Sequence, residues 1–282
     1  MKPAAFDYVR VDSIEEACEL LAEHGDEARL LAGGQSLMPM LNMRLVQTGM
    51  LIDISRCEPL AYTRVESGRL AVGAAQTQAA VEWRATLAQE VPLLSQAFPN
   101  ISHFQIRNRG TVCGSLAHAD PSAELPLCLT ALGGEVVLRS KRGRRALPAE
   151  QFFQGMLSTA RADDELIEEA RFPLRTRGSG YAFEEFSMRH GDYAIAAVAA
   201  VVGSRQIRLA VSGVADRPTA AVWPRLTGDA LAAALNQFAW SLNARDDQQA
   251  SAQYRRHLVR QLGLRAVERA ARDAGATTEP VA

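Results

Sequence analysis

Two glycine-containing segments, each placed directly after an apolar run, constrain this chain more than any other feature. The first reads Leu-Leu-Ala-Gly-Gly-Gln-Ser-Leu over Leu30–Leu37, and the second reads Gly-Thr-Val-Cys-Gly-Ser over Gly110–Ser115. Glycine has no Cβ, so the backbone N–H groups of such loops can approach a phosphate closely. We therefore expect the two loops to form a cradle for the pyrophosphate of a dinucleotide.

The first loop lacks the signatures of two common phosphate sites. It contains no lysine followed by Ser or Thr, which argues against a P-loop kinase or ATPase. The spacing G-x-G-x-x-G of a Rossmann fingerprint is also absent, and Asp53 about twenty residues later is weak evidence alone. What remains is a Gly-Gly turn with Gln35 and Ser36 as neutral donors, which suits a pyrophosphate without a metal ion. The alternative is an ordinary turn after a strand.

The second loop offers two hydroxyl groups, Thr111 and Ser115, and is followed by an acidic turn. In that turn, Glu124 could accept a hydrogen bond from a ribityl or ribose hydroxyl group. Alternatively, it is a first-turn helix acid that the helix dipole stabilises. His103 and His118 lack the spacing of metal ligands, so no metal site is expected.

Composition narrows the partners and the compartment. The chain has 282 residues, enough for two or three domains, and a net charge of −1, which disfavours nucleic acid as the main partner. No segment is long and apolar enough to span a membrane. Four cysteines without a Cys-x-x-Cys pair indicate free thiols in a reducing compartment, so a cytoplasmic protein is expected; they are Cys18, Cys57, Cys113 and Cys128.

Local signals predict where helices and strands begin and end. Ser13 and Glu16 form a capping box, in which each side chain caps the backbone N–H of the other, so a helix is expected from Ile14 to a left-handed stop at Gly25. Apolar runs predict strands at residues 28–32, 50–54, 70–74, 135–138, 166–172, 181–186, 194–202 and 207–211. Further helices are expected at residues 77–89 with a Thr77 cap, 125–132, 228–240 and 255–271. The basic run 139–145, with a central glycine, predicts a solvated hairpin tip.

These elements group into three units. An N-terminal α/β unit is expected at residues 1–56 and a second one at 57–174. A polar, glycine-containing linker at 175–180 then leads into an α+β unit at 175–282, in which strands precede helices. The expected fold class is therefore mixed α+β.

Several of these motifs resemble the FAD-binding medium subunit of the molybdenum hydroxylases. The family includes the flavoprotein subunit of carbon monoxide dehydrogenase and the FAD domain of xanthine dehydrogenase. The matching segments are Ala32–Ser36, Arg107–Thr111 and Leu116–Pro121. Further landmarks follow in the same order and extend the resemblance over nearly the whole chain; these are Phe153-Gln154-Gly155, Asp164-Glu165-Leu166-Ile167 and Arg189–Ala194.

The resemblance implies a flavin-binding fold of the vanillyl-alcohol-oxidase/PCMH type. In it, two α/β subdomains hold FAD between them and an α+β domain follows. Carried over by position, the two glycine loops would bind the pyrophosphate, and Tyr193 would stack on the isoalloxazine ring or limit access to it, unless it is ordinary strand packing. The residues expected to bind the cofactor are Leu31, Ala32, Gly33, Gly34, Gln35, Ser36, Leu37, Ile101, Thr111, Cys113, Gly114, Ser115, Ala117, His118, Glu124, Leu166, Ile167, Asp192 and Tyr193.

One residue departs from the family pattern. Cys113 stands where the family usually has glycine, and its Cβ would enter a place where backbone normally crowds the phosphate. Either the side chain points away or the loop is slightly strained. A reactive, electron-relaying thiol is a third possibility, but no Lys, His or second Cys stands beside it in the sequence to lower its pKa.

The function implied by the resemblance is electron transfer within a complex. A large subunit with molybdopterin would hydroxylate the substrate, and a small subunit would carry two [2Fe–2S] clusters. FAD on this chain would then pass the electrons to an external acceptor, so no catalytic residue is expected here. The complex would be a dimer of heterotrimers. Two alternatives are a self-contained flavin reductase and an interaction subunit that lost its cofactor through Cys113.

Overall fold

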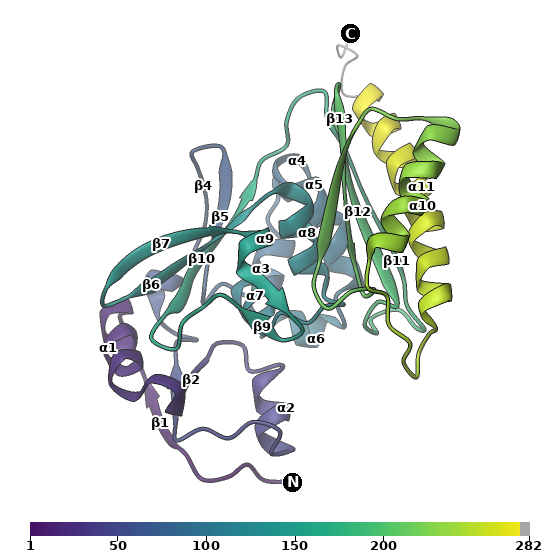
Figure 1. Ribbon diagram of the computed structural model, residues 1–282. Coiled ribbons are helices and arrows are strands. Elements are labelled where there is room, and N and C mark those ends of the chain that lie inside the picture. Colours follow the sequence, from purple (N-terminus) through teal and green to yellow (C-terminus); the bar gives the residue numbers. More distant parts are fainter. Residues whose placement is uncertain (277–282) are drawn as a thin grey trace.

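The computed structural model describes residues 1–276, which form three main sheets, one after another along the chain (Figure 1). Helices and strands alternate in the first part, a run of helices separates two groups of strands in the second, and strands precede helices in the last. The expected mixed α+β class is confirmed. No helix in this described range is both long enough and apolar enough to cross a membrane.

The N-terminal sheet is parallel, with the strand order β1-β3-β2. Its strands are β1 (Asp7–Arg10), β2 (Ala28–Leu31) and β3 (Met50–Asp53). Helix α1 (Ile14–His24) connects β1 to β2, and α2 (Leu37–Asn42) follows the first glycine loop. The loop therefore leaves the carboxyl end of β2, as the sequence predicted.

Helix α1 begins and ends where expected, but its cap is half of a capping box. The Ser13 hydroxyl accepts a hydrogen bond from the Glu16 backbone N–H at 3.1 Å. The Glu16 carboxylate accepts from the Asp12 N–H at 3.2 Å rather than from Ser13, so the reciprocal bond was wrongly assigned. At the other end, Gly25 has φ +53°, a left-handed value that suits glycine.

The second sheet is antiparallel and five-stranded, with the order β4-β5-β10-β6-β7. Its strands are β4 (Thr63–Glu66), β5 (Arg69–Gly73), β6 (Glu135–Ser140), β7 (Gly143–Pro148) and β10 (Leu166–Pro173). The helices of this part are α3 (Gln78–Glu82), α4 (Leu87–Glu90), α5 (Pro92–Ala97), α6 (Phe104–Arg107), α7 (Val112–His118), α8 (Glu124–Leu132) and α9 (Ala149–Phe152). A small hairpin, β8 (Phe153–Gly155) and β9 (Ser158–Thr159), completes it. Helices α7 and α8 pack on one face of β10, which fixes the second glycine loop at the edge of a rigid core.

The single helix expected from Thr77 to Gln89 is in fact two short ones. Thr77 does cap α3, accepting from the Ala80 N–H at 3.2 Å, but α3 ends at Glu82. The Arg84 N–H then bonds to the Val81 carbonyl, three residues back, and the chain turns. Arg84 also donates two hydrogen bonds to Glu90, at 2.6 and 2.9 Å, which hold α4 in its new direction. The break occurs although neither Gly nor Pro stands between Glu82 and Leu87.

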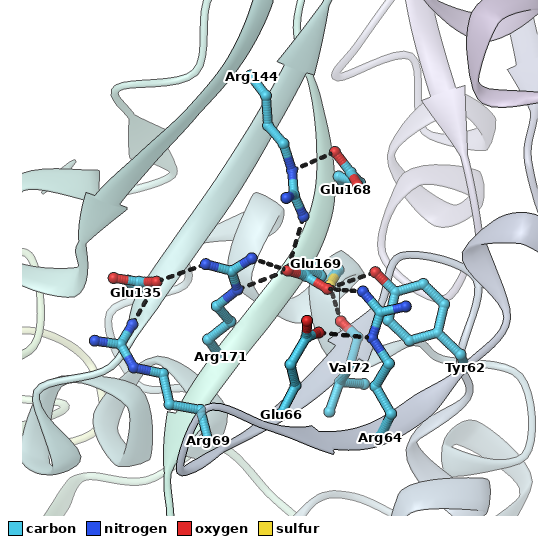
Figure 2. A network of polar contacts seen from close by, with 11 residues as sticks. Tyr62, Arg64, Glu66, Arg69, Val72, Glu135, Arg144, Glu168, Glu169 and Arg171 are labelled. Carbon is cyan, nitrogen blue, oxygen red and sulfur yellow. Dashed lines mark hydrogen bonds and ion pairs between the residues drawn. The ribbon is translucent and has the colours of Figure 1, made fainter.

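The other face of the five-stranded sheet carries a network of arginines and glutamates (Figure 2). At its centre is Glu169, whose carboxylate is fully buried. It accepts hydrogen bonds from Arg144 at 2.9 Å, from Arg171 at 2.6 Å and from the Tyr62 hydroxyl at 2.5 Å. The buried charge is thus compensated by Arg171 on the same strand and by Arg144 on β7, as a buried carboxylate requires.

The expected hairpin at residues 139–145 is confirmed as the turn between β6 and β7. Its arginines, however, are not merely solvated. Arg142 pairs with Asp164 at 2.7 Å, and Arg145 pairs with Glu165 at 2.6 Å. The basic run therefore ties the hairpin to the start of β10.

The C-terminal sheet is antiparallel, with the order β11-β12-β13-β14. Its strands are β11 (Gly180–Phe186), β12 (Ala196–Val202), β13 (Gln206–Ser212) and β14 (Thr219–Pro224). Helices α10 (Gly228–Ser241) and α11 (Ala252–Ala276) cover one face, and α5 and α8 of the preceding part pack on the other. Strand β12 is apolar throughout because it is buried on both faces. Strand β14 was not predicted from the sequence; four of its residues are only partly buried, and its Val222 is exposed.

Candidate cofactor site

A cavity of about 520 Å³ lies where the two glycine loops meet. Its walls come from the loop after β2, the first turn of α7, the start of α8 and the loop at residues 191–193. This volume lies within the usual range of small-molecule and cofactor sites. Segments that are far apart in the sequence thus converge on one space.

The two glycine loops touch through their backbones at Gly33. A Cβ built on Gly33 would lie 2.3 Å from the Arg109 carbonyl oxygen and 2.7 Å from the Gly110 Cα atom. No side chain fits into such a gap, because real Cβ contacts are not this short. Gly34 has φ +71°, a conformation that also favours glycine. Gly33 is therefore required for the close approach of the two loops, and Gly34 is required for the turn.

The first loop presents backbone donors that have no protein acceptor. Within the described part of the chain, the N–H groups of residues 33–36 donate to no protein group. The Gln35 side-chain amide instead donates to the Gly33 carbonyl at 2.9 Å and braces the loop. The Gln78 Oε1 atom, on another part of the cavity wall, is buried without a partner in the described structure. Unpaired polar groups of this kind are expected where a polar ligand binds.

The second loop is organised by a helix cap. The Thr111 hydroxyl accepts from the Gly114 N–H at 2.9 Å and so fixes the first turn of α7. A Cβ on Gly114 would lie 2.7 Å from that same hydroxyl oxygen, so glycine is needed there too.

Cys113 points away from the cavity and into the core. Its residue is 3% exposed, its Sγ lies 3.4 Å from the Val72 carbonyl oxygen, and its φ is not in the left-handed region. Burial raises the pKa of the thiol well above its ordinary value. Of the three interpretations considered for Cys113, the structure thus supports the first, a side chain that points away. The change from glycine does not block the loop.

The cavity wall formed by the start of α8 and the loop at residues 191–193 carries acidic groups. Glu124, the first residue of α8, is 5% exposed, and burial raises the pKa of its carboxyl group to about 7, with Asp120 adding like charge. Burial and these two acids raise the pKa of the Tyr193 phenol to about 12. His118 has its pKa lowered by burial, so it is a neutral group at neutral pH. Further negative charge is therefore unfavourable at this wall.

The structure brings nearly all the predicted site residues to this one cavity. Leu31 and Leu166 are the exceptions, since neither lines it and Leu166 is fully buried in the core. The predicted residues that line the cavity are Ala32, Gly33, Gly34, Gln35, Ser36, Leu37, Ile101, Thr111, Cys113, Gly114, Ser115, Ala117, His118, Glu124, Ile167, Asp192 and Tyr193.

Sequence reasoning missed two arginines in the wall. Arg29 donates to the Asp26 carbonyl at 2.7 Å, and Arg161 donates to the Glu165 carbonyl at 2.6 Å. Both guanidinium groups are therefore held in place by backbone oxygens and not by carboxylates. No motif marks either residue, and they are far apart in the sequence, so only the folded chain shows that they line the same cavity.

These residues fit FAD. Two backbone clusters with free or capped N–H groups suit a pyrophosphate, and the glycines leave the space that it needs. The half-exposed phenol ring of Tyr193 and the buried Glu124 both line the cavity, and a ring system with a polar chain would lie beside them. No group of three or more His, Cys, Asp or Glu side chains suitable for a metal ion occurs among the described residues.

Comparisons with known proteins agree with this geometry. Residues 4–175 match the family described as "FAD binding domain in molybdopterin dehydrogenase". The nicotine 6-hydroxylase medium subunit of Paenarthrobacter nicotinovorans is 37% identical, covering 99% of this chain and 100% of that protein. The 6-hydroxypseudooxynicotine dehydrogenase complex subunit alpha from the same organism is 46% identical, over 72% of this chain and 68% of that protein.

Solved structures extend the agreement over the whole fold. A chain of CO dehydrogenase from Oligotropha carboxidovorans superposes with a TM-score of 0.93 at 33% identity, covering 97% of this chain and 100% of that one. A chain of quinoline 2-oxidoreductase from Pseudomonas putida 86 gives a TM-score of 0.90 at 32% identity, with 97% and 99% covered. This chain therefore belongs to the FAD-binding medium subunits of the molybdenum hydroxylases and is an oxidoreductase component.

Proposed function

We propose that this chain carries FAD as the electron-transfer subunit of a heterotrimeric molybdenum hydroxylase. A small subunit would supply electrons from two [2Fe–2S] clusters, and a large molybdopterin subunit would oxidise the substrate. Bound FAD would take up these electrons and release them in pairs to an external acceptor. The observation that carries the proposal is the cavity at the meeting point of the two glycine loops, with backbone donors that lack protein acceptors.

The roles of individual residues are part of this proposal. Ala32–Leu37 and Thr111–Ser115 would bind the pyrophosphate and adjoining atoms of FAD. Ala117, His118 and Glu124 would lie along the ribityl chain and flavin, with Ile101 and Ile167 packing nearby, whereas Asp192 and Tyr193 would lie near the isoalloxazine ring. Their common position in the cavity wall supports these assignments. We likewise propose units at residues 1–56, 57–174 and 175–282, a dimer of heterotrimers, and a cytoplasmic location.

The relatives bear on the substrate of the whole complex. Two of them are named for 6-hydroxypseudooxynicotine and caffeine, at 46% and 42% identity. Both compounds contain nitrogen heterocycles, so we propose a heterocycle of this kind as the substrate of the large subunit.

The test is a flavin measurement followed by reconstitution. The full chain, purified from cells supplied with riboflavin, should show flavin absorption and release about one FAD per chain on denaturation. In the complex with its two partner subunits, addition of a heterocyclic substrate without an acceptor should bleach that absorption. A complex without FAD would refute the cofactor assignment. Bleaching of the isolated chain by substrate would instead support a self-contained reductase.

A further inference from the structure

The cavity wall contains two arginines that form no ion pair within the described residues. Arg29 lies on β2, the strand that leads into the first glycine loop, and Arg161 lies on the segment between β9 and β10. Among the described residues of the wall, these two side chains carry the permanent positive charge, because no lysine lines the cavity and burial lowers the pKa of His118. The N-terminal part and the second part of the chain therefore contribute one cation each.

Arg161 is anchored through one of its nitrogen atoms. Its Nη1 atom donates to the Ala162 carbonyl at 2.9 Å and to the Glu165 carbonyl at 2.6 Å. The Glu165 carboxylate is engaged elsewhere, since it accepts two hydrogen bonds from Arg145, at 2.6 and 2.7 Å, and one from the Ala162 N–H at 2.9 Å. These bonds fix the segment that carries Arg161, whereas its Nε and Nη2 atoms have no protein acceptor in the described part of the chain.

Arg29 is anchored in the same way. Its Nη1 atom donates to the Asp26 carbonyl at 2.7 Å and to the Ala28 carbonyl at 2.8 Å. Its Nε and Nη2 atoms likewise donate to no described protein group. A guanidinium group that is held on one side and free on the other is well suited to donate to the oxygens of a phosphate group.

Charge is distributed unevenly around the cavity. Asp120 and Glu124 line it near the start of α8, whereas the two arginines line it at β2 and before β10. Burial lowers the pKa of Arg161; the charge of Asp163 opposes this shift and the charge of Arg29 adds to it. An arginine nevertheless stays charged at neutral pH. A partly buried cation without a counter-ion is costly, so an anionic ligand group is stabilised on this side of the cavity.

We propose that Arg29 and Arg161 bind the adenosine diphosphate half of FAD and supply the positive charge that its diphosphate requires. Their free nitrogen atoms donate to diphosphate oxygens that the backbone N–H groups of the glycine loops leave unpaired. The uncharged flavin half is then left to the side of the cavity that carries Asp120 and Glu124. The inference rests on the proposed function, because it takes FAD as the ligand of this cavity.

The test is a binding experiment on the full FAD-free chain. FAD binding is followed by flavin fluorescence, and ADP is then used to displace the bound FAD. In Arg161→Gln, the Kd of FAD and the inhibition constant of ADP should both rise about 10- to 100-fold, because hydrogen bonds to a charged phosphate are lost. Arg161→Lys keeps the charge without the planar fork and should give intermediate values.

A second variant guards against a folding defect in the first. Arg29→Gln changes a different part of the chain and should raise both constants in the same way. Arg56→Gln is the matched control, because Arg56 is an exposed arginine of the N-terminal part that does not line the cavity. This control should leave both constants unchanged.

The salt dependence of binding separates a contact with the ligand from a purely structural role. The affinity of the wild type for FAD should fall as salt is raised from about 50 mM to about 500 mM, because salt ions screen the attraction between cation and phosphate. This fall should be smaller in Arg161→Gln and in Arg29→Gln. A structural role alone would weaken binding without changing its salt dependence.

Unchanged constants in both arginine variants would overturn the inference, and so would a loss of FAD affinity that leaves ADP binding unaffected. A wild-type chain that binds FAD but not ADP would overturn it as well. Failure of the wild-type chain to bind FAD at all would instead refute the proposed function. In that case, calorimetric titration of the same chain with ADP still decides whether the two arginines bind a diphosphate, so the two failures are distinguishable.

Discussion

Replacing Gly33 with alanine tests whether the contact between the two glycine loops forms the cofactor site. The added Cβ would lie 2.3 Å from the Arg109 carbonyl oxygen, so the loops must separate by about 1 Å to reach an ordinary contact of 3.4 Å. Gly33 has no left-handed φ, which means that the whole effect comes from this contact and not from backbone conformation. Overpacking of this kind costs about 1–3 kcal/mol of folding free energy.

The expected loss of FAD affinity is larger than the loss of stability. A shift of about 1 Å would break hydrogen bonds from the first loop to the pyrophosphate, each worth about 1.5–3 kcal/mol because the acceptor is charged. Loss of two such bonds weakens binding by about 3–6 kcal/mol, which is roughly a 10²- to 10⁴-fold rise in Kd. Titration of the FAD-free chain with FAD, followed by flavin fluorescence, measures this directly.

Two other glycines provide graded controls. In Gly34→Ala the cost should be about 1–2 kcal/mol, because φ is +71° and the nearest neighbours are side-chain atoms at 3.2 Å. Gly49→Ala meets its nearest atom at 3.6 Å and should change stability by less than about 0.5 kcal/mol, without effect on FAD. A folded Gly33→Ala chain that binds FAD as tightly as the wild type would refute the assignment of the pyrophosphate to this contact.

Three further changes probe the supporting structure. Cys113→Ala should cost about 1–2 kcal/mol in urea unfolding by removing a buried Sγ, yet leave FAD affinity unchanged; a large loss of FAD would assign the thiol a role in binding. Thr111→Ala removes the N-cap of α7 and should lower the free energy of unfolding by about 1 kcal/mol, whereas Thr111→Ser should retain the cap. Equal losses of stability in the two variants would argue against a capping role for the hydroxyl group. Glu169→Gln leaves Arg144 and Arg171 without their buried acceptor charge and should lower the free energy of unfolding in urea by about 1–3 kcal/mol. The loss is limited to this range because both arginines are partly exposed and solvent screens them. An unchanged urea midpoint would show that the network adds nothing to the stability of the fold.

The sequence predicted those parts of the site that depend on local chemistry. Gly33, Gly34 and Gly114 stand where a side chain would collide or the backbone turns, and such requirements are visible as glycine itself. The strand before Gly33, β2, was expected from the apolar run at residues 28–32. The split between α3 and α4 was not predicted, because no Gly or Pro marks the turn in the sequence.

The remaining parts of the site depend on which chain segments meet. Arg29 and Arg161 line one cavity although about 130 residues separate them, and each is held by backbone carbonyls that any sequence would provide.

Cys113 shows how the second loop can depart from the usual glycine of the family and still keep its backbone free for a phosphate. In the second loop, the capping hydroxyl of Thr111 occupies the space beside position 114, so glycine is required there. At position 113 the first turn of α7 directs the side chain inward, toward Val72, and the backbone N–H remains available to the cavity. A small apolar side chain that fits this core position therefore leaves the phosphate cradle intact. By the same reasoning, a large or charged residue at 113 would disturb the core before it disturbed the cofactor.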